Sequence, residues 1–435
     1  MPVAVYLLAA LPVCDCILNQ VNTAFEFTLG PLSMLQAVRS ALLVLLGAIA
    51  LWRLSRDQVK LTGFHFCGFA GLAFLGIAIS RELLVSGSVS MPSVGSYGQL
   101  AYWLVLGMVA ASICETRRHA ITILYGVAAG ALASAASIEL GSLVGGLNPY
   151  ASDNVSASVG WFNTAKTITG VLLTGSVVLL YLGRKSRSWW PTLLACFCIA
   201  ASVMTFARAG VVALIAAMIW FACWFLRFHG SRRKTWLSRM LLVALVAACC
   251  APIFVHSASW QSRWEDIDDS SQAGSGRATF WRIALNAYAS GQTAEQAFGF
   301  GYEGMAERLF QDYGDDIKHT HNDLLDSMMV GGLVGVLWFG LWISWLAAKT
   351  LSLPLSSPEG AAAVAVLLIY LCHSQFTGQL FGTDSMASYV VTLACLYRID
   401  SFRRERVPVW QRTLNYRRPD LLRSPQIAPA LIATK

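Results

Sequence analysis

The sequence predicts an all-α polytopic membrane protein with about twelve transmembrane helices and one large helical loop outside the bilayer. Hydrophobic residues make up 56% of the 435 residues, whereas charged residues make up only 13%, well below the roughly 25% of soluble domains. Apolar runs long enough to cross a bilayer, about 20 residues each, recur along nearly the whole chain. These observations exclude a chain of soluble modules.

The apolar runs give the expected helices in chain order. The first run lacks a basic segment before it and a small-residue cleavage site after it, so we expect a retained span rather than a signal peptide. The predicted spans are Val3–Leu18, Val38–Trp52, Leu61–Ser80, Tyr97–Cys114, Ala120–Leu140, Thr164–Leu182, Trp189–Phe206, Ala209–Leu226, Met240–His256, Leu325–Ala347, Ala361–Cys372 and Ser385–Leu396. The chain then divides into transmembrane helices at 1–256, an external loop at 257–324, transmembrane helices at 325–397 and a basic tail at 398–435.

Basic residues fall on every second loop, on the side of the C-terminal tail. The positive-inside rule predicts that this side is cytoplasmic, with both termini there and the large loop outside. The formal charge of +8 is then explained by topology and by contact with anionic membrane lipids. The tail lacks the interleaved motifs of a nucleic-acid-binding segment, so we expect no nucleic-acid partner.

Cations on the opposite side need a reason, and an anionic ligand is one. For Arg39, Arg81, Arg263 and Arg308 we favour the simpler interpretation, in which the side chain snorkels or pairs with an acid. The acids considered for these pairs are Glu265, Asp266 and Asp269.

The most informative external segment is Lys318–Asp323, a polar cluster directly before the apolar run Leu324–Ala347. Polar residues at the mouth of a membrane helix are costly to hold there unless they are used. His319 and His321 belong to this cluster, and histidine is the side chain best suited to move a proton near neutral pH. The cluster is therefore a candidate catalytic site.

Two further expectations concern this cluster. Asn322 or Thr320 is expected to cap the following helix and thereby fix the position of His321. The two histidines, together with Asp315, Asp316 and Asp323, could also bind zinc, but such runs in loops are more often solvated. We therefore favour a site without a metal.

Candidate anion-binding residues lie in three other external segments. Arg208 occupies a turn so short that its guanidinium lies at membrane level, which is expensive without an anion, although capping of helix carbonyls is an alternative. Lys166 enters a span after Gly160–Ala165 and could meet a phosphate or snorkel. Arg277 and Trp281 lie one turn apart in a predicted interfacial helix, and Arg282 follows them.

The pattern of that helix is specific. Its apolar residues Phe280, Ile283, Ala284 and Ala287 recur at helical spacing. A glycine-rich turn is expected at Gly299–Gly304, which contains Tyr302, and a second short helix at Met305–Asp312. In the next span, Gly331 and Gly335 have the spacing of residues that allow close helix packing.

Cations beside an imidazole base suit attack on a diphosphate-activated substrate. The cations stabilise the departing diphosphate, and the base activates an acceptor hydroxyl, which is a poor nucleophile. Outside a bacterial membrane the activated donors are lipid-linked sugars rather than ATP. The residues therefore favour transfer of a glycan from a polyprenyl diphosphate to a hydroxyl group.

The order of the short motifs resembles the O-antigen ligase and polymerase superfamily. The motifs are Phe-Ala-Arg-x-Gly around Arg208, Arg-x-x-x-Trp from Arg277, Gly-x-Gly-x-Glu-Gly from Gly299, and His-Asn at His321 before a Gly-x-x-x-Gly span. They cover residues 160–335, and the first four spans resemble the family only in hydropathy. One departure is Phe206, where a small hydroxyl residue is common in the family.

This resemblance implies roles for individual residues. His321 would be the catalytic base, and Arg208 and Arg277 would bind the diphosphate, assisted by Lys166 and Arg282. The supporting residues would be Asn322, His319, Trp281 and Tyr302. The family transfers glycan from undecaprenyl diphosphate by an inverting displacement without a metal or cofactor, in the bacterial inner membrane with its site facing the periplasm.

The resemblance leaves the acceptor open. A ligase would use the lipid A core, whereas a polymerase would use a second lipid-linked glycan. We favour the ligase because the second external loop, residues 141–163, is modest, whereas polymerases commonly carry a larger one. A protein-directed oligosaccharyltransferase and a lipid-linked glycan transporter are lesser alternatives, because the chain has no appended external domain and its ionisable residues gather at one face.

Overall fold

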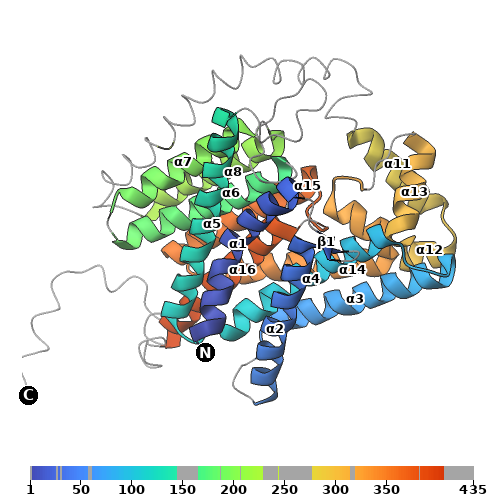
Figure 1. The fold of residues 1–435 in the computed structure, drawn as a ribbon, viewed down its shortest axis with the longest axis horizontal. Helices are drawn as coiled ribbons and strands as arrows, with labels where there is room; N and C mark the ends of the chain where they lie inside the picture. The colour runs from blue at the N-terminus through green and yellow to red at the C-terminus, as the bar shows by residue number, and fades with distance from the viewer. Residues whose placement is uncertain are drawn as a thin grey trace, which may run out of the picture.

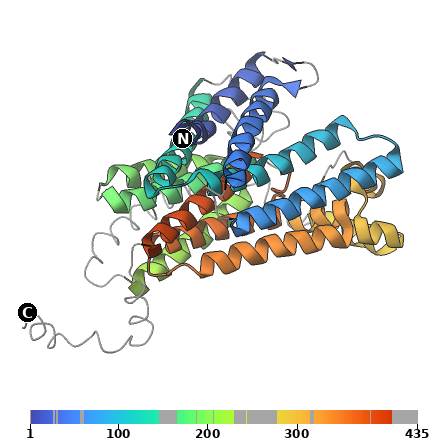
Figure 2. The ribbon, with the colours of Figure 1, turned by 90° about the horizontal axis from the view of Figure 1, so that it is seen from below.

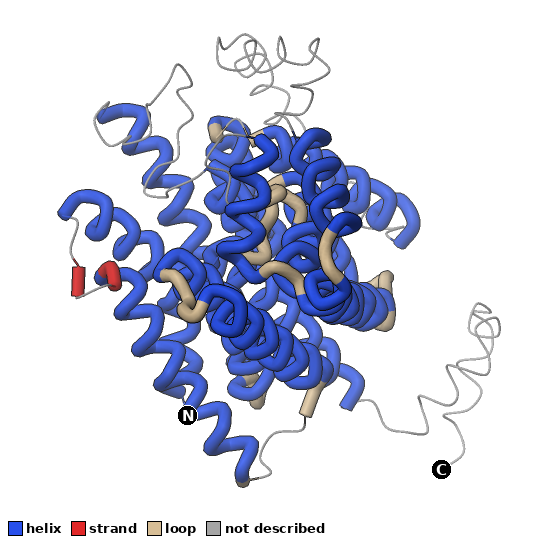
Figure 3. Tube along the Cα trace, turned by 90° about the vertical axis from the view of Figure 1, so that its right-hand side faces the viewer, coloured by secondary structure: helices blue, strands red, loops and turns tan. Residues whose placement is uncertain are grey.

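The computed structural model describes residues 2–25, 28–29, 32–56, 61–144, 165–186, 188–205, 207–228, 243, 277–313, 319–381 and 383–405. Helices dominate these residues (Figure 3), and the one sheet is an antiparallel pair of two-residue strands, β1 (Thr28–Leu29) and β2 (Leu32–Ser33). The predicted all-α fold class is therefore confirmed for the described part of the chain.

The helices follow the apolar runs of the sequence. Those before the large loop are α1 (Pro2–Phe25), α2 (Met34–Ser55), α3 (Gly63–Ser86), α4 (Met91–Ile113), α5 (Arg117–Val144), α6 (Ala165–Ser186), α7 (Trp190–Met204) and α8 (Arg208–Phe228). Those from the loop onward are α11 (Arg277–Ser290), α12 (Thr293–Phe298), α13 (Gly301–Tyr313), α14 (Asp323–Leu351), α15 (Pro358–Phe376) and α16 (Thr383–Glu405). Each predicted span except Met240–His256, of which the structure describes only residue 243, overlaps one of these helices.

Within the described ranges, seven helices are long and apolar enough to cross a membrane: α2, α3, α4, α5, α8, α14 and α15. Shorter apolar stretches lie in α1, α6 and α7. Helix α16, where we predicted the span Ser385–Leu396, is not among these apolar helices. It packs at the centre of the bundle against α4, α5, α6 and α15, where polar side chains such as those of Thr392 and Asp400 are buried.

Arginines gather at one end of the bundle, which we call the basic end and define by Arg53, Arg117, Arg398 and Arg403. The guanidinium of Arg53 donates to the carbonyl oxygen of Ser112 at 2.6 Å, and Arg398 donates to that of Cys114 at 3.1 Å. These contacts bring the ends of α2 and α16 to the turn between α4 and α5. The predicted gathering of basic residues on one side is thus present in the fold.

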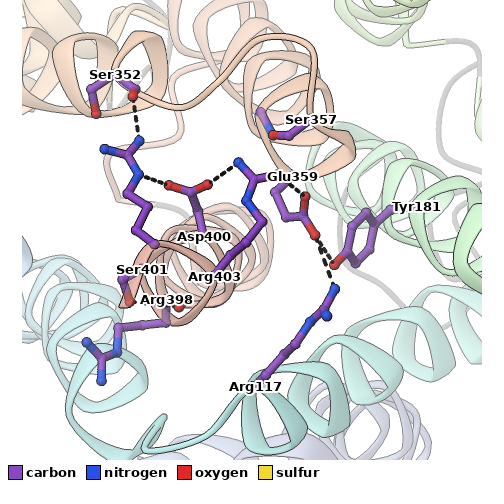
Figure 4. A network of polar contacts seen from close by, with 11 residues as sticks. Arg117, Tyr181, Ser352, Ser357, Glu359, Arg398, Asp400, Ser401 and Arg403 are labelled. Carbon is purple, nitrogen blue, oxygen red and sulfur yellow. Dashed lines mark hydrogen bonds and ion pairs between the residues drawn. The ribbon is translucent and has the colours of Figure 1, made fainter. Parts of the chain in front are cut away.

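Buried carboxylates stabilise the basic end (Figure 4). Glu359, at the start of α15, accepts a hydrogen bond from the Tyr181 hydroxyl at 3.1 Å and pairs with Arg117 at 3.5 Å. Asp400, on α16, accepts hydrogen bonds from Arg403 at 2.9 Å and Arg404 at 2.6 Å. Glu359 also pairs with Arg403 of α16 at 3.9 Å, so ion pairs join α5, α15 and α16, and the hydrogen bond of Tyr181 adds α6.

The opposite end of the bundle carries the helices of the large loop, and we call it the loop end. Helices α11, α12 and α13 lie beyond the ends of α3 and α14 (Figure 1), and α3 runs beside α14 along its length (Figure 2). Gly126 and Gly130 of α5 approach Ala9 and Pro12 of α1 respectively, so these two helices run parallel. The N-terminus of α1 therefore lies at the basic end, as does the end of α16.

Helix α14 is interrupted at Gly332, whose φ of 59° and ψ of −145° are not helical. A Cβ at this position would lie 2.6 Å from the backbone of Ala297 in α12, so only glycine fits. The freed carbonyl of Met329 accepts a hydrogen bond from Phe300 at 2.8 Å. The interruption thus docks the loop helices onto α14.

The predicted Gly331 and Gly335 pair serves two purposes. A Cβ at Gly331 would lie 2.0 Å from the ring of Phe74, which shows the close approach of α3 that we expected. A Cβ at Gly335 would lie 3.2 Å from the same ring, and 2.0 Å from the carbonyl oxygen of Ser327 in its own helix, across the interruption. Both glycines therefore allow the close packing of α3, and Gly335 also accommodates the kink.

Two of the arginines that we expected to snorkel or to pair with acids, Arg39 and Arg308, form ion pairs. Arg39 pairs with Asp15 of α1 at 3.0 Å, and Arg308 pairs with Glu295 of α12 at 3.7 Å. The expectation of ion pairs is confirmed for both, but the partners differ from the loop acids that we considered. Arg263 lies outside the described residues.

Candidate functional site

His321 has a left-handed backbone conformation, with φ of 61°. No other non-glycine residue in the described ranges has a positive φ. This conformation costs an L-residue about 1–2 kcal/mol, so the surrounding contacts must maintain it. Such an outlier at a candidate base is the local signature of a site whose geometry is fixed by its neighbours.

Asn322 caps the first turn of α14, as the sequence predicted. Its side-chain oxygen accepts hydrogen bonds from the backbone N–H groups of Leu324 at 3.0 Å and Leu325 at 3.2 Å. Its amide group donates to the side-chain oxygen of Gln375 at 3.0 Å. The residue after His321 is therefore tied both to α14 and to the end of α15.

The imidazole of His321 is half-buried and meets the connection between α15 and α16. Its Nδ1 lies 3.3 Å from the carbonyl oxygen of Thr377. A carbonyl oxygen can only accept, so this contact requires the proton on Nδ1 and leaves Nε2 as the basic nitrogen. The ring of His319 lies edge-on at 4.2 Å between centroids, and the ring of Phe280 lies at 6.4 Å.

Two carboxylates in the first turn of α14 are buried beneath His321. Asp326 accepts hydrogen bonds at 2.7 Å from both the backbone N–H and the hydroxyl of Thr320. Asp323 accepts hydrogen bonds from the backbone N–H groups of Gln379 at 2.5 Å and Leu380 at 2.7 Å. Both carboxyl groups lie in the first turn of α14, near the positive end of its helix dipole.

Helix α11 carries Arg277, one of the predicted anion-binding residues, and contacts the segment directly before His321. The apolar residues at helical spacing are buried as expected, and the indole N–H of Trp281 donates to the carbonyl oxygen of Thr320 at 3.2 Å. Arg277 lies one turn before Trp281, and therefore on the same side of α11. Arg282 is exposed, and no described contact joins it to His321.

Arg208 is the first residue of α8 and is half-buried. A Cβ at Gly210 would lie 2.2 Å from Thr169, so the starts of α8 and α6 are in contact. Lys166 lies one turn before Thr169 in α6, but its side chain is outside the described residues. The turn with Arg208 and the first turn of α6 therefore lie together.

The position of Arg208 along the bundle follows from its neighbour α15. The indole of Trp220, in α8, donates to the carbonyl oxygen of Ala361 at 2.9 Å, and the two helices are antiparallel. Both helices rise about 1.5 Å per residue, which places Arg208 at the level of the last turn of α15. That turn leads to Gln375 and Thr377, which contact the segment of His321.

Tyr302, in the first turn of α13, is buried. Its backbone N–H donates to the Tyr97 hydroxyl at 3.0 Å and to Glu82 at 3.2 Å, and its ring packs edge-on against Phe381 at 5.2 Å. The predicted glycine-rich turn at Gly299–Gly304 is wrong in extent. Helix α13 already begins at Gly301, and the buried carboxylate of Glu82 accepts a hydrogen bond from the N–H of Tyr302 in its first turn.

The sequence reasoning missed the residues that face His321 from the other side. Thr377, Gly378 and Gln379 form the connection between α15 and α16, and Gln375 and Asp326 complete the surroundings of the histidine. The available signal was the short polar run Thr377–Gln379, with a glycine between two apolar helices. Such a run predicts a turn but does not predict which residue the turn contacts. The long-range pairing with His321 is not encoded in any local pattern.

The possible zinc ligands do not come together in the described ranges, where no group of three or more His, Cys, Asp or Glu side chains is placed to hold a metal ion. Asp315 and Asp316 lie outside these ranges. The Asp323 carboxylate turns toward the backbone of Gln379 and Leu380.

The fold and site define a polytopic membrane protein with a half-buried histidine at one end of its helix bundle. Residues 193–340 match the family model described as O-Antigen ligase, a segment that contains Arg208, Arg277, His319 and His321. This match covers about a third of the chain and agrees with the resemblance to the O-antigen ligase and polymerase superfamily that the motifs indicated. The matched family is one of glycosyltransferase-like enzymes that act on lipid-linked glycans. No curated protein matches the chain.

Proposed function

We propose that this protein is an O-antigen ligase, which transfers glycan from undecaprenyl diphosphate to a hydroxyl group of the lipid A core. The observation that carries the proposal is the arrangement of His321, with its left-handed backbone and its Nδ1 at the carbonyl oxygen of Thr377. His321 also lies within the segment that matches the family. A neutral histidine held in one tautomer is suited to act as a general base.

The side of the membrane on which the reaction takes place is inferred from the distribution of basic residues. If the basic end faces the cytoplasm of a bacterial inner membrane, as the positive-inside rule predicts, His321 faces the periplasm and both termini are cytoplasmic. This is the side on which lipid-linked glycans are available and ATP is not. We therefore propose that the large loop is periplasmic.

In the proposed reaction, Nε2 of His321 removes the proton of the acceptor hydroxyl as its oxygen attacks the anomeric carbon of the donor glycan. The bond between that carbon and the diphosphate oxygen breaks, and undecaprenyl diphosphate departs with the bonding electrons. Attack from the face opposite the leaving group inverts the anomeric configuration. The family resemblance supports a mechanism without a metal or cofactor.

The departing diphosphate needs positive partners. We propose that Arg208 and Arg277 bind it through bidentate hydrogen bonds, which match the geometry of phosphate oxygens. Lys166, beside Arg208 in the first turn of α6, would add charge. The exposed position of Arg282 suits an outer contact with the donor rather than a contact with the diphosphate at His321.

Reconstitution tests the proposal directly. Purified protein in vesicles would receive a glycan on undecaprenyl diphosphate and lipid A core as acceptor. Glycan on the core supports a ligase, whereas glycan growing on its own lipid carrier indicates a polymerase. Most of the loop that bears on this choice, residues 141–163, lies outside the described residues, so the product decides it.

The matched pair of variants in this assay is His321→Ala and His319→Ala. The two rings are neighbours, at 4.2 Å between centroids, so both variants remove an imidazole from the same place. We expect only His321→Ala to abolish transfer. Transfer that continues in His321→Ala, or a loss confined to His319→Ala, would contradict the assignment of the base.

A further inference from the structure

The conformation of His321 depends on the residues on either side of it. All three backbone and side-chain polar groups of Thr320 are engaged: its N–H and hydroxyl donate to Asp326, and its carbonyl accepts from Trp281. The residue before the candidate base therefore has no freedom to rotate without breaking buried hydrogen bonds. Loss of such bonds costs about 1–3 kcal/mol for each buried group left unpaired.

Gly378, in the connection between α15 and α16, packs closely against the backbone of His321. Its φ is 61°, and a Cβ there would lie 3.1 Å from the Cα of His321 and 3.2 Å from Oδ2 of Asp326. The backbone after Thr377 thus lies against both the histidine and the carboxylate. This close approach is what places the Thr377 carbonyl oxygen at Nδ1 of His321.

The side chain of Asp326 reaches both segments. One of its oxygens holds Thr320, and the other lies beside Gly378. It is 1% exposed, so water does not compete for these contacts. Its neighbour Asp323 fixes the same connection one residue further on, through the N–H groups of Gln379 and Leu380.

We propose that Asp326 is a positioning residue that holds His321 in its left-handed conformation between Thr320 and Gly378, and so keeps Nδ1 on the carbonyl of Thr377. The inference rests on the proposed role of His321 as the base. Asp326 touches no substrate in this scheme. It acts by fixing which imidazole nitrogen is basic and where that nitrogen points.

The hydrogen bonds that Asp326 accepts make it possible to separate the effect of its shape from the effect of its charge. Both bonds from Thr320 end on the same oxygen, Oδ1, so an asparagine can accept both through its amide oxygen. Asp326→Asn should therefore preserve the arrangement, whereas Asp326→Leu should destroy it. Thr320→Val is a milder variant that removes the hydroxyl, which donates to Asp326 and accepts from the backbone N–H of Asn322, and leaves the backbone hydrogen bond to Asp326 in place. The matched control is Ser327→Ala, since this buried hydroxyl bonds only to the carbonyl of Leu324 in its own helix.

Two measurements test the proposal on the purified, reconstituted protein. The first is the rate of glycan transfer, separated into kcat and KM for the lipid-linked donor. The second is the rate at which diethyl pyrocarbonate modifies His321, read by peptide mass spectrometry against His119, which lies at the basic end. The second measurement reports the exposure and tautomer of the ring without any turnover.

In Asp326→Leu we expect kcat to fall about 100-fold, the scale of a misplacement of about 1 Å, with little change in KM. The modification rate of His321 should change as well, and Thr320→Val should shift both quantities in the same direction. Asp326→Asn and Ser327→Ala should stay close to the unsubstituted protein. If Asp326→Leu does not fold, Thr320→Val and Asp326→Asn still provide the comparison.

An unchanged modification rate at His321 in both Asp326→Leu and Thr320→Val would overturn the positioning role, whatever happens to transfer. So would an Asp326→Asn variant that loses as much activity as Asp326→Leu. Failure of the proposed function looks different. In that case His321→Ala retains transfer, while the modification rate at His321 still responds to substitution of Asp326.

Discussion

The indole N–H of Trp281 donates a hydrogen bond to the carbonyl oxygen of Thr320 at 3.2 Å, and this bond joins the large external loop to the backbone directly before His321. Helix α11 carries both Trp281 and, one turn earlier, Arg277. The bond therefore couples the position of a candidate diphosphate ligand to that of the candidate base.

Trp281→Phe should keep the aromatic packing of α11 but remove this hydrogen bond. A hydrogen bond of this kind contributes about 0.5–1.5 kcal/mol, so we expect the rate of transfer to fall up to about tenfold. The rate of glycan transfer in vesicles measures the effect. Trp190→Phe is the control, because Trp190 is 71% exposed on α7, and it should leave the rate unchanged.

Arg208→Ala and Arg277→Ala should each lower kcat/KM for the lipid-linked donor roughly 10- to 100-fold, as expected for the loss of hydrogen bonds to a charged group. Lysine at either position should restore only part of the activity, because a point charge cannot replace a bidentate fork. Arg308→Ala serves as the control, since Arg308 pairs with Glu295. Full activity of both lysine variants would argue against diphosphate binding by these arginines.

Gly332→Ala should destabilise the protein by more than about 1 kcal/mol, because a side chain there is strained by the positive φ and meets the backbone of α12. The unfolding temperature in detergent, followed by intrinsic fluorescence, measures the loss. Gly340→Ala, in the same helix, is the comparison. A Cβ at Gly340 has no atom within 4 Å, and alanine there should leave the protein equally or more stable.

Glu359→Ala should lower the unfolding temperature while leaving the catalytic rate of the folded protein nearly unchanged. The carboxylate is buried and holds Tyr181, Arg117 and Arg403 at the basic end, far from His321 along the helices. The effect should stay moderate because both arginines are 44% exposed and reach water when the acid is lost. Arg118→Ala, at an exposed neighbouring position, should change neither quantity.

The parts of the fold that were predictable are those fixed by local pattern. Apolar runs located the spans because each must bury or face lipid along its whole length. The spacing of Phe280, Ile283, Ala284 and Ala287 located α11, and the side chain of Asn322 located the start of α14. These features depend on residues within one or two helical turns.

The features that escaped prediction depend on contacts between distant segments. Gly332 interrupts α14 because α12 lies against it, and Gly301 begins α13 because Glu82 is buried beside it. Asp326 and Gly378 became recognisable as neighbours of His321 only when the end of α15 met the start of α14. None of these pairings leaves a periodic trace in the sequence.

The left-handed backbone of His321 also decides which inactive variant is most useful. Alanine lacks the imidazole and also disfavours a φ of 61°, so it would let the turn relax. Asparagine adopts this conformation several-fold more readily than most residues and cannot serve as a base near neutral pH. His321→Asn is therefore the variant suited to trapping donor and acceptor together, in a chain whose turn is already shaped for both.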